Sequence, residues 1–402
     1  MPRGPTETSR RTVRRAVLLF CLAGGCTGVV TNSTDQEASV STDDGTSLPD
    51  GLSQAKLVWK SSQTHLGAIH GLTAQGTTLY VSADTGLYLF ILASTLQPRC
   101  SSPSGGTSTP ISAPATLDSA GNAYFTRTSQ QCLSSIDSGC NPRWNLAGLN
   151  YFDCSAASDT QPVLVSGGSQ VVIATAMDTS KVAHIFGVNA ANGTLAWHET
   201  LTNQSVARSL TASASDQIYV GTTSGGVGVL YTLTPSSTTP VQLLTASEFH
   251  APGLVLSNGN LVIGDWNKNL HAVNGSGGTV WKATTGGRVI SAPVEANGTV
   301  VVATIIFGIN ALSLTGSPVW NFQNSMVHYA GVAVDSAGVV YLGSAGDCAG
   351  GGTGGCVFAI QQGKPVWSYQ TERAVEATPL IHSGMVIVGD EGGTIYALST
   401  AD

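Results

Sequence analysis

Residues 262–281, VIGDWNKNLHAVNGSGGTVW, decide the fold of this chain. Apolar residues alternate with polar ones on both sides of a short polar turn, and a Gly-rich turn then leads into Thr-Val-Trp. Since strand side chains alternate between two faces, the stretch predicts three strands joined by two short turns. The sequence VIVGDEGGTIYAL at residues 386–398 repeats the pattern, with Gly389 and Asp390 at the positions of Gly264 and Asp265. Recurrence of this kind predicts stacked units that share a core.

Tryptophans set the period of the repeat. Those that close a copy are Trp59, Trp144, Trp197, Trp281, Trp320 and Trp367. The 308 residues from Trp59 to Trp367, divided over seven steps, give a mean repeat of 44 residues. A unit of this length with several short strands is typical of a β-propeller blade. The apolar spacing of two excludes a helical repeat.

The two ends of the chain complement each other. Residues 57–61 (LVWKS) contain a blade-closing Trp with no strands before it, and the last copy ends at Leu398 without a Trp strand. We therefore predict that the N-terminal strand completes the C-terminal blade, which leaves no open edge in the ring. The predicted fold is an all-β, eight-bladed propeller of four-stranded antiparallel blades over residues 56–402. Seven blades stay open as an alternative, because three blades are weakly marked.

The repeat ending A-L-(D/N)-A-x-x-G-x-x-x-W resembles the pyrroloquinoline-quinone-like propeller repeat. That repeat occurs in quinoprotein alcohol dehydrogenases and in the lipoprotein scaffold subunit of the outer-membrane β-barrel assembly machine, which this chain resembles most in size and layout. The resemblance covers residues 57–398. It implies the fold, and it leaves the function to other residues because the motif positions are structural.

The N-terminus resembles an export signal. Five arginines precede the short apolar core at residues 16–25, and Ala-Gly-Gly before Cys26 resembles a lipobox. We predict a signal peptide over residues 1–25, a lipid on Cys26 and a flexible Ser/Thr/Asp/Gly-rich tether over residues 26–55. An ordinary secretory signal cut nearby is the alternative. The apolar run at residues 300–312 is too short to span a bilayer.

Charge limits the partners. Without residues 1–25 the chain has 12 Lys and Arg against 23 Asp and Glu, a net charge of −11. Such an acidic protein has no electrostatic footprint for nucleic acid and no attraction to anionic lipid. We expect an exported monomer in the bacterial envelope, on the periplasmic side of the outer membrane or on the cell surface, attached to the membrane through its lipid alone.

Six cysteines besides Cys26 follow the signal, an even number that suits an oxidising compartment. We predict that Cys348–Cys356 closes a Gly-rich insertion and that Cys132–Cys140 staples a hairpin of the second blade. Cys100 stands where the first blade should have its Trp. The pair Cys100–Cys154 follows by elimination.

No constellation of residues predicts catalysis. Alignment of the first strands places His70 and His250 with Ser291 and Ala377 in a ring facing the channel. A neighbouring packed ring would hold Ile69, Phe249, Ile290, His328 and Glu376. The two histidines lie four blades apart, too far for one metal ion. The family's dehydrogenases use a vicinal disulfide, a Trp beneath the quinone and a calcium ion. This chain has no Cys-Cys pair, and its free Trp266 falls in a turn.

We therefore expect no catalytic residues, no metal and no cofactor, and the alternative is that pyrroloquinoline quinone and calcium are bound. Loops on one rim carry the residues most suited to binding: Arg288, His328, Arg373, Glu376, His70 and His250. The apolar turn Ile305, Ile306 and Phe307 indicates a second contact point, or packing against a neighbouring loop. The sequence predicts a protein-binding scaffold for outer-membrane protein assembly or envelope maintenance. The alternative is a quinone-dependent dehydrogenase, or a sensor that binds a sugar or another small ligand in the funnel.

Overall fold

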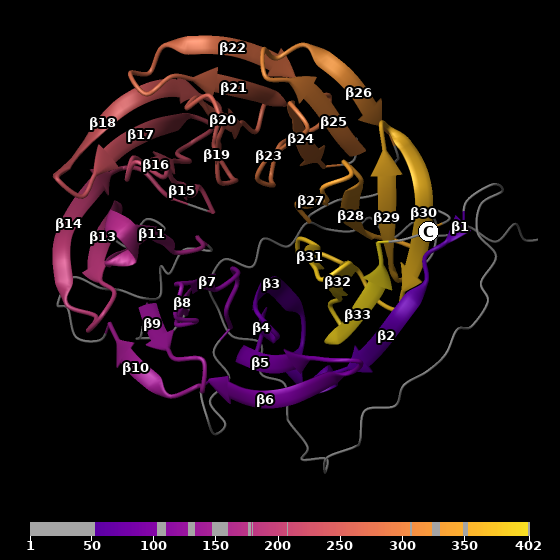
Figure 1. Cartoon of the computed structure of the whole chain (residues 1–402). Coiled ribbons are helices and arrows are strands. Elements are labelled where there is room, and N and C mark those ends of the chain that lie inside the picture. Colours follow the sequence, from indigo (N-terminus) through magenta and orange to yellow (C-terminus); the bar gives the residue numbers. More distant parts are fainter. Residues whose placement is uncertain are drawn as a thin grey trace, which may run out of the picture. The chain divides into compact units, whose positions relative to one another are not determined.

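The chain forms a ring of eight four-stranded antiparallel sheets (Figure 1). A computed structural model describes residues 53–102, 110–127, 133–146, 160–175, 178, 180–206, 208–305, 308–323, 330–348 and 353–400. The eight-bladed propeller predicted from the sequence is confirmed, and the seven-bladed alternative is wrong. The predicted signal, Cys26 and nearly all of the predicted tether lie outside the described residues.

The first four blades follow the chain in order, each from an inner strand to an outer strand. Blade 1 is β3 (Ile69–Gln75), β4 (Thr78–Ala83), β5 (Gly86–Leu92) and β6 (Leu96–Ser102). Blade 2 is β7 (Thr116–Leu117), β8 (Ala123–Thr126), β9 (Leu133–Ile136) and β10 (Pro142–Asn145). Blade 3 is β11 (Val163–Val165), β12 (Gln170–Ala174), β13 (Val182–Asn189) and β14 (Leu195–Thr202). Blade 4 is β15 (Leu210–Ala212), β16 (Ile218–Gly221), β17 (Gly228–Thr234) and β18 (Ser237–Ala246).

The other four blades repeat this order. Blade 5 is β19 (Leu254–Val255), β20 (Leu261–Gly264), β21 (Asn269–Val273) and β22 (Thr279–Thr284). Blade 6 is β23 (Val294–Ala296), β24 (Thr299–Thr304), β25 (Gly308–Ser313) and β26 (Pro318–Phe322). Blade 7 is β27 (Val332–Val334), β28 (Val340–Ala345), β29 (Gly355–Gln361) and β30 (Lys364–Thr371). Blade 8 is β31 (Leu380–His382), β32 (Met385–Gly389), β33 (Thr394–Ser399) and, from the other end of the chain, β2 (Leu57–Ser62). Two short 3-10 turns, η1 (Thr64–Leu66) and η3 (Ser166–Gly168), complete the described elements.

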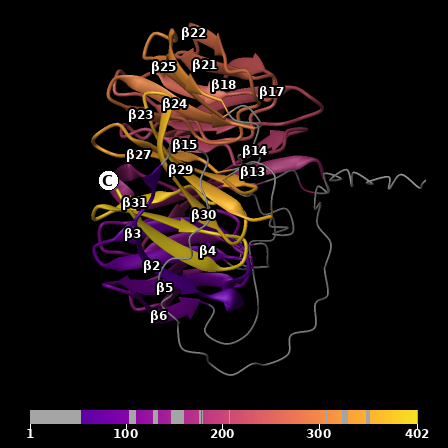
Figure 2. The ribbon, with the colours of Figure 1, turned by 90° about the vertical axis from the view of Figure 1, so that its right-hand side faces the viewer.

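The ring closes as predicted, because β2 pairs antiparallel with β33. Trp59 lies opposite Ala397, and the ladder runs on to Ser62 opposite Thr394. The indigo and yellow strands of the two chain ends therefore adjoin in both views (Figures 1 and 2). The outer strand of blade 8 is the first full strand of the described chain.

A short strand ahead of β2 was missed by the sequence analysis. β1 (Ser53–Gln54) pairs parallel with β30 and gives blade 7 a fifth strand. Ala55 follows it, is buried between blades 7 and 8, and donates its N–H to the Ser368 carbonyl at 3.3 Å. Residues 53–55 are therefore docked on the propeller, so their assignment to a flexible tether over residues 26–55 is wrong. A strand of two residues is too short to leave a recognisable alternation of apolar and polar residues.

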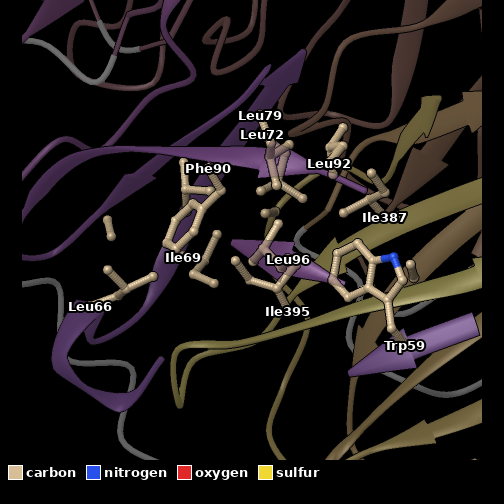
Figure 3. Packing of buried hydrophobic residues seen from close by; sticks show 14 residues of the cluster. Trp59, Leu66, Ile69, Leu72, Leu79, Phe90, Leu92, Leu96, Ile387 and Ile395 are labelled. Carbon is tan, nitrogen blue, oxygen red and sulfur yellow. The ribbon is translucent and has the colours of Figure 1, made fainter. Parts of the chain in front are cut away.

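The hydrophobic core is divided into eight clusters, one between each pair of neighbouring blades. At the seam, Trp59, Ile387 and Ile395 of blade 8 pack against blade 1 residues that include Leu66 and Phe90 (Figure 3). Trp59 is only 2% exposed. Each blade is therefore stabilised mainly by the blades beside it, since a single sheet cannot bury both of its faces.

All six predicted blade-closing tryptophans lie on outer strands, opposite a small or short side chain of the third strand. Their positions are Trp59 in β2, Trp144 in β10, Trp197 in β14, Trp281 in β22, Trp320 in β26 and Trp367 in β30. One further regularity was not predicted. In all eight blades the outer strand bulges next to this position. A bulge increases the local twist and re-aims the neighbouring side chain.

Two of the tryptophans dock on a turn of the next blade. The indole N–H of Trp144 donates to the Ala190 carbonyl at 2.9 Å, and that of Trp281 donates to the Leu314 carbonyl at 2.9 Å. Each ring covers a glycine of the same turn. A Cβ on Gly193 or Gly316 would lie 2.7 Å from the ring, and both glycines have positive φ. The turn thus requires glycine for two reasons, conformation and space.

Blades 1 and 2 are joined by a disulfide at this same place. Cys100 occupies the Trp position of blade 1, and Cys140 occupies the docking-glycine position of blade 2, with φ +63°. The two sulfurs are bonded, with the Cα atoms 6.1 Å apart. The predicted pairs Cys132–Cys140 and Cys100–Cys154 are therefore wrong, since Cys100 and Cys140 are taken by each other. Cys132 and Cys154 lie outside the described residues. The structure also contains the Cys348–Cys356 disulfide, the pair expected from the sequence.

Exchanging the disulfide for the tryptophan dock should largely preserve stability. We expect Cys100→Ser with Cys140→Ser to lower the free energy of unfolding by about 2–5 kcal/mol, because a loop of 40 residues is no longer closed. Cys100→Trp with Cys140→Gly should recover at least half of that loss, since it recreates the Trp281–Gly316 contact. Urea unfolding of the three proteins measures both effects. Equal stability of the two double variants would show that the positions are not equivalent.

Candidate functional site

The predicted rim is one face of the ring. It carries the connections between blades and the turns between the second and third strands, which lie at the same end because neighbouring strands are antiparallel. The opposite face carries the turns between first and second strands and between third and fourth strands. The described rim residues that were singled out from the sequence are all on the first face.

A cluster of Glu248, His250, Trp266 and Arg288, which we call the blade 5 rim cluster, stands out on this face. The Arg288 guanidinium lies over the Trp266 ring, 4.4 Å from its centroid. The His250 ring contacts the same indole at a centroid distance of 4.5 Å, and its Nε2 lies 3.2 Å from Glu248 Oε2. The backbone N–H of Trp266 donates to the Glu248 carbonyl at 2.9 Å. Trp266 is therefore held between a cation and an imidazole while its surface stays partly open to solvent.

A second cluster at the ring seam has the same layout with different chemistry. We call His70, Asp84, Glu376 and Glu391 the seam cluster. His70 Nε2 lies 2.7 Å from Asp84 Oδ1, and Asp84 Oδ2 accepts the Ala68 N–H at 3.0 Å. The hydrogen bond from His70 is the main reason why the pKa of Asp84 is lower than usual. Burial and then the nearby Glu376 carboxyl raise the pKa of Glu391.

The repeat explains why the two clusters correspond. Trp266 follows Asp265 as Glu391 follows Asp390, so both side chains occupy the same turn of their blades. Each of these two side chains lies between the segment that enters the first strand of its own blade and the segment that enters the first strand of the next blade. Trp266 thus meets His250 and Arg288, whereas Glu391 meets Glu376 and the charge of His70. The two clusters occupy equivalent backbone positions of their blades, but the seam cluster is acidic whereas the blade 5 rim cluster is aromatic and cationic.

In two blades, the residue predicted to pack between blades lies one position too late in the sequence. A Cβ on Gly264 would clash with Val289, and one on Gly343 would clash with Val375. These valines are fully buried, and they fill the place that Ile69 fills against Gly389 and Phe249 fills against Gly221. Ile290 and Glu376 were predicted there, and Ser291 and Ala377 in the channel ring. The first strand begins five residues after the packed residue in blades 5, 6 and 8, but the proline before it stands three residues after Phe249 and four residues after each valine, which shifts an alignment on the proline by one. Glu376 therefore belongs with His70 and His250.

An aspartate beneath the rim fixes the turn that presents Trp266. Asp265, which is 2% exposed, accepts hydrogen bonds from the Asn269 N–H at 2.9 Å and from His271 Nε2 at 2.8 Å. Burial alone would raise the pKa of Asp265, but the hydrogen bonds from His271 and Asn269 hold it below its ordinary value. Asp390 ties the turn of Glu391 in the same way, through the Thr394 N–H and the Tyr396 hydroxyl. The sequence had marked both aspartates as repeat positions without giving them this role.

The remaining predicted residues are placed as follows. Arg373 is exposed beside Gly392, next to the seam cluster. Ile305 is partly buried and donates its N–H to the Arg288 carbonyl at 3.0 Å, which places the start of the apolar turn next to the blade 5 rim cluster. Ile306, Phe307 and His328 lie outside the described residues. Trp266 was missed, since its place in a turn had suggested no function, although its alignment with Glu391 was visible.

The arrangement favours binding. In the described part of the chain, no group of three or more His, Cys, Asp or Glu side chains could hold a metal ion. His70 and His250 each pair with a carboxylate of their own cluster, four blades apart in the ring. Nor does any helix of the described residues have the length and apolar character needed to cross a membrane. What the rim offers is an exposed arginine stacked on an aromatic ring.

The fold and repeats define an eight-bladed propeller, and comparison with known proteins supports its resemblance to the pyrroloquinoline-quinone-like repeat family. The family model described as "Outer membrane protein assembly factor BamB" matches residues 234–325 and 306–402. The curated BamB of Burkholderia pseudomallei is 35% identical over 114 residues, which are 28% of this chain. The match spans 29% of the length of that relative.

Solved structures support the fold over a larger part of the chain. The crystal structure of BamB from Moraxella catarrhalis superposes with a TM-score of 0.64 at 13% identity, covering 86% of this chain and 98% of that one. The computationally designed Ika8 protein superposes with a TM-score of 0.63, also at 13% identity, covering 84% of this chain and 98% of the designed chain. The second similarity shows that this architecture by itself carries no particular function.

Stability should depend on the ionisation of Asp265. Its lowered folded-state pKa means that the stabilisation is complete above the ordinary Asp pKa and is lost as pH falls through the lower folded value. We expect Asp265→Asn to cost about 2 kcal/mol at pH 7 and progressively less toward pH 2. Urea unfolding at several pH values measures this. The exposed Glu372→Gln is the control, with an expected change below about 1 kcal/mol. A cost for Asp265→Asn that does not depend on pH would contradict the assignment.

Proposed function

We propose that this protein is a protein-binding scaffold of the bacterial envelope that works in outer-membrane protein assembly or envelope maintenance. The names of the curated relative and of the matching family model, outer membrane protein assembly factor BamB, support this role. The observation that carries the proposal for this chain is the blade 5 rim cluster, where Arg288 is stacked on Trp266 at an exposed edge. Trp and Arg are enriched among the few residues that supply most of the binding energy of protein interfaces.

The charges around Arg288 favour a protein partner with an acidic side chain. The guanidinium has no ion pair within the described residues, and its planar face is already ordered by the indole. Such an arginine can donate two parallel hydrogen bonds to a carboxylate without first losing much side-chain entropy. The partly buried Ile305 beside it adds apolar surface at the same edge. The seam cluster presents the opposite charge, so it would orient the same partner or contact a basic segment.

Attachment to the membrane is part of the proposal. An acidic propeller has no attraction of its own to anionic lipid, so anchoring would depend on a lipid at Cys26. The partner would then be another envelope protein, bound by a monomeric propeller with no cofactor. The rigid ring suits this work, since rim loops are held in place by eight packed interfaces.

Reversing the rim charge should abolish capture of the partner. We expect Arg288→Glu with Arg373→Glu, and separately Trp266→Ala, to reduce the partner recovered by crosslinking and purification from envelopes at least tenfold. Both arginines are exposed, so the melting temperature should be unchanged. Lys282→Glu with Lys364→Glu introduces the same charge change on exposed outer-strand residues and serves as the matched control.

Two results would contradict the scaffold proposal. One is undiminished recovery of the partner with both rim variants. The other is a rise in melting temperature on addition of pyrroloquinoline quinone and calcium, together with dye reduction in the presence of alcohols or sugars.

Replacing the predicted lipid acceptor tests the anchor separately. We expect Cys26→Ala to move the protein from the membrane fraction to the soluble fraction, because the remaining chain offers no second anchor. Ultracentrifugation of lysed cells followed by immunoblotting measures the distribution. The control is Cys21→Ala, which lies in the apolar core of the signal and should remain in the membrane fraction. If Cys26→Ala fractionates with membranes as before, attachment runs through a partner protein.

A further inference from the structure

A cavity of about 410 Å³ lies between blades 6 and 7, on the face of the ring opposite the rim. Its floor is formed by valines of the two blades and by Trp320, which is half-buried. Its edge is formed by the turns that carry Asn297 and Gln362, together with Gln361. The volume is within the range of small-molecule sites in proteins. Neither the rim function nor the ring closure uses this cavity.

The cavity exists because one turn is short. At the interface of blades 5 and 6, Trp281 is covered by a five-residue turn, residues 313–317, whose Leu314 carbonyl accepts its indole N–H. At the interface of blades 6 and 7, the corresponding turn has two residues, Gln362 and Gly363. It is too short to cover Trp320 in the same way. The indole N–H of Trp320 has no hydrogen-bond partner within the described residues.

Three polar side chains at the edge of the cavity are also available for hydrogen bonds. The carboxamides of Asn297, Gln361 and Gln362 are exposed, and none has a hydrogen-bond partner in the part of the chain that the structure describes. Asn297 and Gln362 each have a φ of +50°, the left-handed conformation of tight two-residue turns, which fixes their side chains at the edge of the cavity. Among the residues that the structure describes, no charged side chain lines the cavity.

We propose that this cavity, which we call the blade 6–7 groove, binds a neutral saccharide. The apolar face of a pyranose ring can stack on the Trp320 indole, whose free N–H can donate to a ring or hydroxyl oxygen. Sugar hydroxyls donate and accept hydrogen bonds at once, and carboxamides match them because each has both an acceptor oxygen and a donor NH₂ group. An uncharged lining gives no gain to an anionic or cationic ligand, so selectivity favours a neutral one.

The groove would act independently of the rim. It lies at the other end of the strands from the blade 5 rim cluster, so a protein partner at the rim and a saccharide in the groove could be bound together. This second site would let the propeller contact a glycan while it holds its protein partner.

Calorimetric titration of the propeller with chitotriose, cellotriose and maltotriose tests the proposal. We expect at least one of them to bind with a Kd of about 1 mM or tighter. Trp320→Ala should weaken that binding at least tenfold. Because Trp320 also packs against the core, the double variant Asn297→Gly and Gln362→Gly provides a second test. Glycine suits their positive φ, so the fold should be kept while two carboxamides are lost, again with at least tenfold weaker binding.

The matched control is Ser383→Gly, the same substitution at the same kind of turn in blade 8, with φ +50°. It should bind the saccharide like the parent protein. Three outcomes would overturn the proposal: no binding of any of the three probes, binding that the groove variants leave unchanged, or binding of decaproline in the groove without binding of the saccharides.

Discussion

The pairing of β2 with β33 is the interaction on which the rest of the structure depends. Every hydrophobic cluster of the described residues lies between two blades, and the cluster at the seam exists only when the first described outer strand completes the last blade. A propeller that failed to close would expose two blade faces and a strand edge at once. Closure thus converts eight marginal sheets into one cooperative unit, in which no blade has a core of its own.

Most of the fold could be predicted because single residues, above all the tryptophans, identify each copy of the repeat. The tryptophan spacing gave the blade length, and the unmatched ends of the chain indicated closure. The Cys100–Cys140 bond was missed, although Cys100 was recognised at a Trp position. Cys140 stands four residues before Trp144, as the docking glycines Gly193 and Gly316 stand four residues before Trp197 and Trp320. The spacing marks Cys140 as a docking position, but that this position meets the Trp position of the preceding blade depends on interblade packing, which the sequence alone does not contain.

The sequence analysis predicted which loops form the rim, but it did not predict which rim side chains contact one another. Arg288, His250 and Glu376 were expected on one face, and the structure places them there. That Arg288 stacks on Trp266 could not be inferred, because it depends on how the turn of one blade reaches the start of the next. Such distances are set by the twist of the sheets and by interblade packing, which a linear alignment does not contain. The same limit caused the shift by one residue that placed Glu376 in the packed ring instead of Val375.

A disulfide at one interface stands where a tryptophan docks on a glycine at another, so equivalent positions of the repeat can be joined by different chemistry. At the interface of blades 6 and 7, the shorter turn Gln362–Gly363 leaves the groove at Trp320 open, and no other contact among the described residues replaces the dock. The contacts at one interface can therefore differ from those at the other interfaces, provided that the ring still closes.

The two-residue strand β1 has a mechanical consequence. A pull on the chain ahead of Ser53 reaches β1 and Ala55 before it reaches β2, because these residues precede β2 and are fastened to blade 7. The β1 attachment has two paired residues, and the β2 ladder has five. Tension on the chain ahead of Ser53 would therefore separate β1 from β30 first, while the strand that closes the ring stays unloaded. The small fifth strand of blade 7 would in this way protect the ring closure from a pull on the N-terminal segment.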